Sequence, residues 1–192
     1  MFYDCNCLAR ITLPDKLQSL GSHEFYACES LKSIRLPEGL EKIGKLCFWS
    51  SGLKEIALPA SVKEVCEGVF LGCKQLRNVQ LNEGLEKLGE RAFYDSAIKN
   101  IILPSTLKRI EAETFRGCYR LTHVDIPNGI EYIGRECFCG CEIEKITLPG
   151  TLKEIGQNAL TYCRSLRTVH VKEGCALDIK KYVDENVEVI RE

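Results

Sequence analysis

The sequence predicts a solenoid of stacked repeats, a β-rich α/β fold in which short parallel strands are joined by short helical or 3₁₀ turns. Three observations predict it. A Leu-Pro dipeptide or a variant of it returns at steps of 22 or 23 residues, a phenylalanine column keeps the same period, and one column of charged residues alternates in sign. A period of this length is typical of stacked repeats rather than of a single globular core.

The dipeptide column fixes the register of the repeats. Its second members are Pro14, Pro37, Pro59, Asn82, Pro104, Pro127 and Pro149. Because proline cannot donate to a strand ladder, we expect it to end a short strand. The inward residues of these first strands form a column from Ile11 and Ile34 to Val169. A second extended segment follows in each unit, ending at Ile43 in the unit of Ile34, and Gly44 then allows a bend.

The aromatic column is expected to fill the interior. It consists of Phe2, Phe25, Phe48, Phe70, Phe93, Phe115 and Phe138, continued by Leu160. Each fully buried apolar side chain contributes about 1.5–3 kcal/mol. A single unit cannot shield its own apolar side chains from water, so the units must stack.

The charged column supports in-register stacking. It reads Glu41, Lys63, Glu86, Lys108, Glu131 and Lys153. Parallel neighbours lie ~4.8 Å apart, and opposite charges on adjacent strands stabilise the pairing. We therefore interpret this column as structural rather than as a binding site.

Composition excludes some classes of function. The net charge is −1 with mixed signs, which does not indicate a nucleic-acid partner. No apolar run approaches the ~20 residues of a membrane span, and residues 1–5 lack the features of a signal peptide. A surface or secreted location therefore requires a longer precursor, and a cytoplasmic location stays open. No cofactor is predicted.

The twelve cysteines fall mostly in repeat columns. One column contains Cys5, Cys28, Cys73, Cys118, Cys141 and Cys163, and serines replace cysteine in two units. This pattern favours small buried groups that are mostly free thiols. Disulfides between column neighbours, such as Cys5–Cys28, remain an alternative because ~4.8 Å suits their geometry. The Cys137-x-Cys139-x-Cys141 spacing is shorter than that of usual zinc sites, which disfavours a metal.

The pattern Leu-x-x-Ile-x-Leu-Pro-x-x-Leu-x-x-Ile-Gly-x-x-x-Phe-x-x-Cys, repeated over residues 2–175, resembles the BspA-like, or treponemal-type, leucine-rich repeat. The resemblance implies a right-handed solenoid that binds proteins without catalysis, often within adhesin-like surface or secreted proteins. Residues 176–192 resemble the terminal unit of that family, with a helix over 178–185 and a strand over 187–190. We thus expect a solenoid over 1–175 and a capping unit over 176–192. Because the chain begins mid-repeat, we also expect further repeats or a partner to cover its open end.

The outward side of the strands is the first candidate site. Solenoids use such extended strand surfaces to bind partners, here a protein ligand such as a host surface or matrix protein. The outward positions predicted to bind are Ser33, Arg35, Glu55, Asn78, Gln80, Asn100, Ile102, His123, Asp125, Lys145 and Thr147.

Two alternatives remain for the site. Exposed aromatic residues can anchor a partner, and one stripe follows the phenylalanine column at Tyr3, Tyr26, Trp49 and Tyr94. We favour packing over the neighbouring turn for this stripe. The weaker alternative is a hydrolytic enzyme that uses His123 and Asp125 for acid–base chemistry; a solvated strand face explains this pair more simply. An intracellular scaffold is the alternative to a surface protein.

Overall fold

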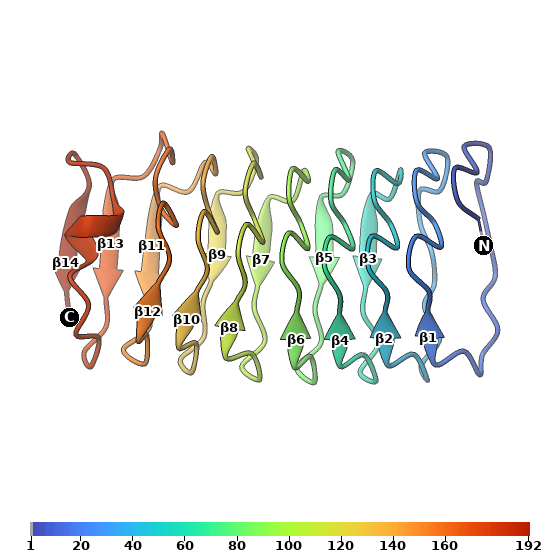
Figure 1. Ribbon diagram of the computed structural model, residues 1–192, viewed down its shortest axis with the longest axis horizontal. Helices are drawn as coiled ribbons and strands as arrows, with labels where there is room; N and C mark the ends of the chain where they lie inside the picture. Colours follow the sequence, from blue (N-terminus) through green and yellow to red (C-terminus); the bar gives the residue numbers. More distant parts are fainter. Residues whose placement is uncertain (1) are drawn as a thin grey trace.

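A computed structural model describes residues 2–192, so that Met1 of the predicted solenoid lies outside the described residues. The chain winds into a parallel β-solenoid of about eight turns. The turns stack along one axis, and the two ends of the chain lie at opposite ends of the stack (Figure 1). This architecture confirms the predicted solenoid, whereas the predicted helical turns are wrong, as described below.

Strands of two residues form one column, which we call the short-strand column. In each, the second residue is buried, and within a sheet it pairs in parallel with its equivalent in the next turn, as Leu20↔Ile43 and Ile43↔Val65 do. The strands form the sheets β1-β2-β4-β6 and β12-β10-β8. Their bounds are β1 Ser19–Leu20, β2 Lys42–Ile43, β4 Glu64–Val65, β6 Lys87–Leu88, β8 Arg109–Ile110, β10 Tyr132–Ile133 and β12 Glu154–Ile155.

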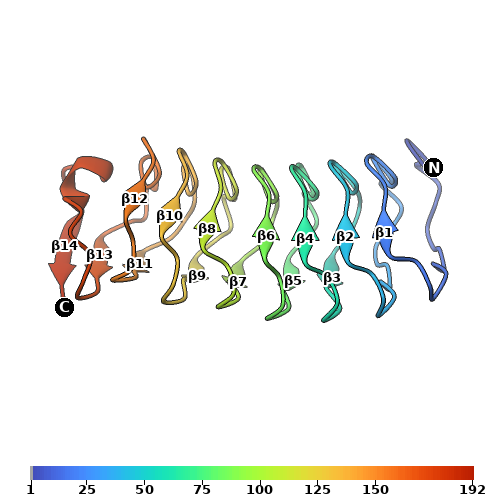
Figure 2. The same cartoon turned by 60° about the horizontal axis from the view of Figure 1, so that its bottom comes forward.

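Strands of three or four residues form the long-strand column, which runs alongside and is visible as a separate row of arrows in Figure 2. Its sheets are β3-β5, β7-β9 and β11-β13-β14. In the three-residue strands the central side chain points inward and its two neighbours point outward, as expected of the period of two. The bounds are β3 Glu55–Ala57, β5 Asn78–Gln80, β7 Asn100–Ile102, β9 His123–Asp125, β11 Lys145–Leu148, β13 Thr168–Val171 and β14 Glu188–Arg191.

The strands expected around Ile11 and Ile34 are not formed. Ile34 is buried, as predicted, but its segment is extended chain without a ladder. One backbone hydrogen bond, from Lys54 N to Lys32 O at 2.9 Å, connects this segment to the next turn. Among the described residues, no further backbone hydrogen bonds join the segment to β3. Ladder pairing in this column therefore begins at β3.

The turn that carries each phenylalanine is not helical, which corrects the expected helical or 3₁₀ turns. The residues two before and two after Phe48, Leu46 and Ser50, have φ values of 53° and 50°. Left-handed residues at both places interrupt a right-handed helix. Alternate amides donate instead to the next turn, as Phe48 N does to Val69 O at 2.9 Å.

The phenylalanines form one continuous file, which confirms the prediction. Successive rings from Phe2 to Phe138 are stacked, with centroid distances between 5.2 Å (Phe70–Phe93) and 5.7 Å (Phe93–Phe115). Phe25 to Phe138 are fully buried, and Leu160 continues the column with 1% exposure. The file is the axis of a core that every turn shares with its neighbours.

The end of the chain contains one short helix. A helix was predicted over 178–185. The structure has a 3₁₀ helix of four residues there, η1 (Ile179–Tyr182), so the predicted helix was too long. It ends because Val183 is extended and the chain turns back through the bond from Val187 N to Asp184 O. The strand expected over 187–190 forms one residue later, as β14, and pairs in parallel with β13.

Candidate partner-binding surface

The eleven outward positions predicted to bind all lie on one side of the solenoid, and all are exposed. Those on strands are in register from turn to turn, as in Glu55↔Asn78, Asn100↔His123 and Ile102↔Asp125. We call this surface the strand face. It consists of Ser33, Arg35, Glu55, Asn78, Gln80, Asn100, Ile102, His123, Asp125, Lys145 and Thr147.

Side chains of the strand face are free to meet a partner. Within residues 2–192, none of the eleven side chains makes an ion pair or a side-chain hydrogen bond, since all such contacts of the described chain join other residues. Ile102 adds a large apolar group with 66% exposure. The face therefore offers donors, acceptors and one apolar contact that folding leaves unused.

The short-strand column differs, because several of the charges along it pair with one another. Within the predicted alternating column, Lys63 contacts Glu86 at 3.9 Å and Lys153 contacts Glu131 at 2.7 Å, whereas Glu41 and Lys108 form no ion pair in the described structure. Glu64 contacts both Lys42 (2.7 Å) and Lys87 (2.8 Å). The charges of this column stabilise the stack and are less available for binding.

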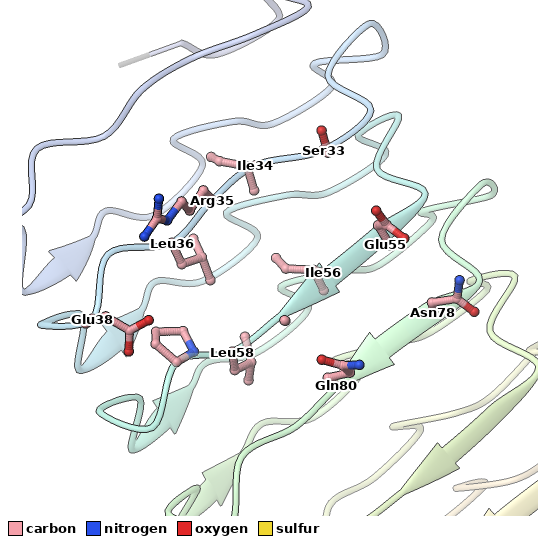
Figure 3. Close-up of a pocket in the computed structure, with 12 residues that line it drawn as sticks. Ser33, Ile34, Arg35, Leu36, Glu38, Glu55, Ile56, Leu58, Asn78 and Gln80 are labelled. Carbon is pink, nitrogen blue, oxygen red and sulfur yellow. The ribbon is translucent and has the colours of Figure 1, made fainter.

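The strand face is hollowed at its N-terminal half. A groove of about 640 Å³ lies over the turns of Ser33, Glu55 and Asn78. Ala57 is the smallest member of its outward column and lies between Arg35 and Gln80, so its short side chain leaves the hollow. In Figure 3 the labelled polar side chains border this groove, whereas Ile34 and Ile56 point toward the core.

The His123 and Asp125 pair shares the outward side of β9, as predicted. Both side chains are exposed, and no hydrogen bond joins them in the described part of the chain. General acid–base catalysis requires a positioned group within hydrogen-bond reach of a bound substrate. An open, solvated strand face surrounds the pair, so its geometry favours the simpler explanation.

Three members of the aromatic stripe stack on one another. Tyr3 and Tyr26 have ring centroids 4.5 Å apart, and Tyr26 and Trp49 have centroids 4.3 Å apart. Tyr94 is separate, with the Arg116 guanidinium 5.6 Å from its ring. Tyr26 and Trp49 are half-buried and pack over neighbouring turns.

All twelve cysteines are free thiols. Five of them donate to the carbonyl of a phenylalanine one turn earlier, as Cys73 Sγ does to Phe48 O at 3.0 Å. Burial raises the pKa of the Cys73 thiol to about 11 and that of Cys118 to about 12. Such thiols are protonated and unreactive at neutral pH. Among the described residues, no His, Cys, Asp and Glu cluster could hold a metal.

Sequence reasoning missed a second groove, which we call the polar groove. Its volume is about 580 Å³, and it lies beside β5 and β7. Asn78 and Asn100 belong both to its lining and to the strand face. A signal was present in the sequence, since a basic residue precedes three successive strands at Lys54, Arg77 and Lys99.

The model of the BspA type Leucine rich repeat region matches six copies over residues 1–120 and 86–189. The chain belongs to the BspA-type leucine-rich repeat family. That description is of a repeat and indicates no catalytic family. A search of curated proteins gives no match. In residues 2–192, no helix has the length and apolar character needed to cross a membrane.

Solved leucine-rich repeat proteins share the fold. A leucine-rich repeat protein from Bacteroides ovatus ATCC 8483 has a TM-score of 0.82 and 25% identity, and the match covers all of this chain and 58% of that one. A leucine rich cell surface protein from Faecalibacterium prausnitzii A2-165 has a TM-score of 0.52 and 18% identity, covering 93% of this chain and 78% of that one. A leucine-rich repeat protein from Eubacterium ventriosum ATCC 27560 has a TM-score of 0.52 and 19% identity, covering 81% and 49%. This chain thus spans little more than half of the Bacteroides protein.

Proposed function

We propose that this chain is a non-enzymatic protein-binding module and that the strand face is its binding surface. The observation that carries the proposal is the contrast between the two strand columns. Several charges of the short-strand column pair with one another, whereas no side chain of the strand face forms such a pair in the described structure, and all are exposed. Repeat solenoids bind partners through extended surfaces of this kind.

We place the module in a cell-surface or secreted adhesin-like protein, with a host surface or matrix protein as its partner. One structural neighbour is described as a leucine rich cell surface protein, which supports this location. The twelve free thiols favour the second candidate, an intracellular scaffold, because reducing compartments preserve thiols. Protease treatment of intact cells that express the natural protein separates the two, since only a surface protein is cleaved.

A capture experiment tests the strand face. The purified module is immobilised and exposed to an extracellular-matrix extract, in parallel with the variant Arg35→Glu/Gln80→Lys/Asp125→Lys. The control variant, Lys16→Gln/Lys108→Gln, changes exposed residues outside the strand face. We expect proteins that bind the wild type and the control to be lost from the strand-face variant. Equal capture by all three would overturn the proposal.

A further inference from the structure

The polar groove has a basic half. Arg77 and Lys99 occupy equivalent places in successive turns, each one residue before a strand, and Arg120 lies in the next turn. All three side chains are exposed, and within residues 2–192 none forms an ion pair. Nearby, Lys74 pairs with Asp95. The groove therefore retains three positive charges that the fold leaves unneutralised.

Its other half is acidic. Glu144 occupies the place equivalent to Arg77 and Lys99, two turns beyond Lys99, and Glu142 lies beside it. Glu142 accepts a hydrogen bond from Ser165 at 2.6 Å, and in the described structure neither carboxylate pairs with a cation. The sign of the charge thus reverses along the solenoid axis.

This reversal discriminates between classes of ligand. A uniformly anionic polymer that lies along the groove meets two carboxylates after three cations, and like charges at an interface oppose binding. A polypeptide can present acidic and basic side chains in the required order. Three turns separate Arg77 from Glu144, about 14 Å at ~4.8 Å per turn, which an extended peptide spans with about four residues at ~3.4 Å each.

The remaining lining groups also suit a polypeptide. Asn78 and Asn100, which also belong to the strand face, lie in adjacent turns directly after Arg77 and Lys99. Their amides both donate and accept hydrogen bonds, as peptide groups do. Tyr119 is 45% exposed and lies at the basic half, with the Arg120 guanidinium 5.8 Å from its ring centroid. An exposed tyrosine in a groove is typical of an interface anchor.

We propose that the polar groove binds an extended segment of a partner protein whose acidic end and basic end lie about four residues apart, which is the separation of Arg77 and Glu144. The segment lies along the solenoid axis, with its acidic side chains on Arg77, Lys99 and Arg120 and its basic side chains on Glu142 and Glu144. This inference deepens the proposed function, on which it rests, by specifying the chemistry of the partner.

Fluorescence anisotropy with synthetic ligands tests the groove without the natural partner. The probe is a labelled peptide with aspartates at one end, lysines at the other and a short Gly-Ser spacer between them. An all-aspartate peptide of the same length and a sulfated oligosaccharide are the comparison ligands. We expect the mixed-charge peptide to bind the wild type more tightly than either comparison ligand.

Two groove variants and one control complete the test. Arg77→Gln/Lys99→Gln is expected to weaken binding of the mixed-charge peptide about tenfold, whereas Lys16→Gln/Lys108→Gln leaves it unchanged. Glu142→Gln/Glu144→Gln should shift the preference toward the all-aspartate peptide. Thermal unfolding of each variant verifies that it is folded. Apart from Glu142, the substituted residues are exposed: Lys16, Arg77, Lys99, Lys108 and Glu144.

Tighter binding of either comparison ligand to the wild type, no binding of the mixed-charge peptide, or indifference to Arg77→Gln/Lys99→Gln would each overturn the groove proposal. The strand-face variant Arg35→Glu/Gln80→Lys/Asp125→Lys keeps the charged residues of the groove. If it loses matrix capture while the peptide assay fails in the wild type, the groove proposal fails and the proposed function stands. If the mixed-charge peptide binds but the strand-face variant captures the same proteins as the wild type, the groove proposal stands and the strand face is not the binding surface.

Discussion

Gly89 illustrates how a single residue permits the close approach of two turns. It belongs to the column of Gly44, where the sequence pattern predicts a bend, but neither residue has a positive φ. The reason for glycine is the neighbouring backbone: a Cβ at Gly89 would lie 2.6 Å from the carbonyl carbon of Cys66. Cys66 and Glu111 occupy the same column, so the need for glycine depends on the local approach of each turn.

At this scale we predict that Gly89→Ala destabilises the protein by about 1–3 kcal/mol, because the overlap with backbone forces the turns apart. Gly39→Ala is the matched control, since its Cβ would meet nothing closer than 3.8 Å, and we expect a change within about 0.5 kcal/mol. Urea unfolding measures both. A Gly89→Ala protein as stable as Gly39→Ala would contradict the steric explanation.

The thiols provide a second prediction at the scale of residues. Cys7 is exposed, whereas the Sγ atoms of Cys73 and Cys118 are buried and burial raises their pKa. In native protein at about pH 8, near the ordinary thiol pKa, we expect DTNB to react rapidly with Cys7, and Cys7→Ser to remove this rapid phase. Cys73→Ser should retain it. Denatured protein should release the signal of all twelve thiols; a smaller number without reductant would indicate disulfides.

At the scale of elements, β2, β4 and β6 are connected by a three-membered charge ladder. Glu64 lies between Lys42 and Lys87, and the hydrogen bonds that these lysines donate lower the pKa of its carboxyl to about 2. The alternating column predicted from the sequence lies one residue earlier in each turn, and the ladder of Lys42, Glu64 and Lys87 was not predicted. In both columns, opposite charges recur one repeat apart in the sequence. Glu64 contacts the lysines of both neighbouring turns, Lys42 and Lys87.

We predict that Glu64→Gln lowers the free energy of unfolding by about 1 kcal/mol at neutral pH. Because the pKa of Glu64 is depressed in the folded state, its stabilisation is complete above the ordinary value near 4.5 and is lost as the pH falls toward 2. The difference from the wild type should therefore vanish near pH 2. Glu154→Gln is the control, in the same column without an ion pair among the described residues. A pH-independent difference would exclude the ion pairs as its cause.

Elements were predicted unevenly. Period and apolar spacing identified both strand columns, yet the segment of Ile34 forms no ladder, because pairing depends on hydrogen bonds to the next turn rather than on side-chain pattern. The turns around Phe48 were expected to be helical. Their left-handed residues, Leu46 and Ser50, are not glycine, and the sign of positive φ lies only in the equivalent places of other turns, such as Gly68 and Gly72.

At the scale of the whole molecule, each turn contacts mainly its two neighbours, and the phenylalanine file extends through the stack. This simplicity is why the strand face was predictable: the period of two determines which side chains point outward, and the repeat aligns them. The polar groove was not predictable in the same way. It combines strand positions such as Asn100 with Tyr119 and Arg120, which lie in the turn between Phe115 and β9.

We predict that Phe93→Ala, at the centre of the file, destabilises the protein by about 3–5 kcal/mol because it leaves a cavity between Phe70 and Phe115. Phe93→Leu should cost much less, since Leu160 occupies the same column. Because solenoid stability is approximately a sum of repeat and nearest-neighbour contributions, hydrogen exchange should show that amides in the turns of Phe70, Phe93 and Phe115 lose protection first. In particular, the Phe70 amide, which donates to Ala92 O at 2.8 Å, should exchange faster, while the amide of Phe25 keeps its wild-type rate. A uniform loss of protection from Phe25 to Phe138 would instead indicate a solenoid that unfolds as one cooperative unit, and the nearest-neighbour description would fail.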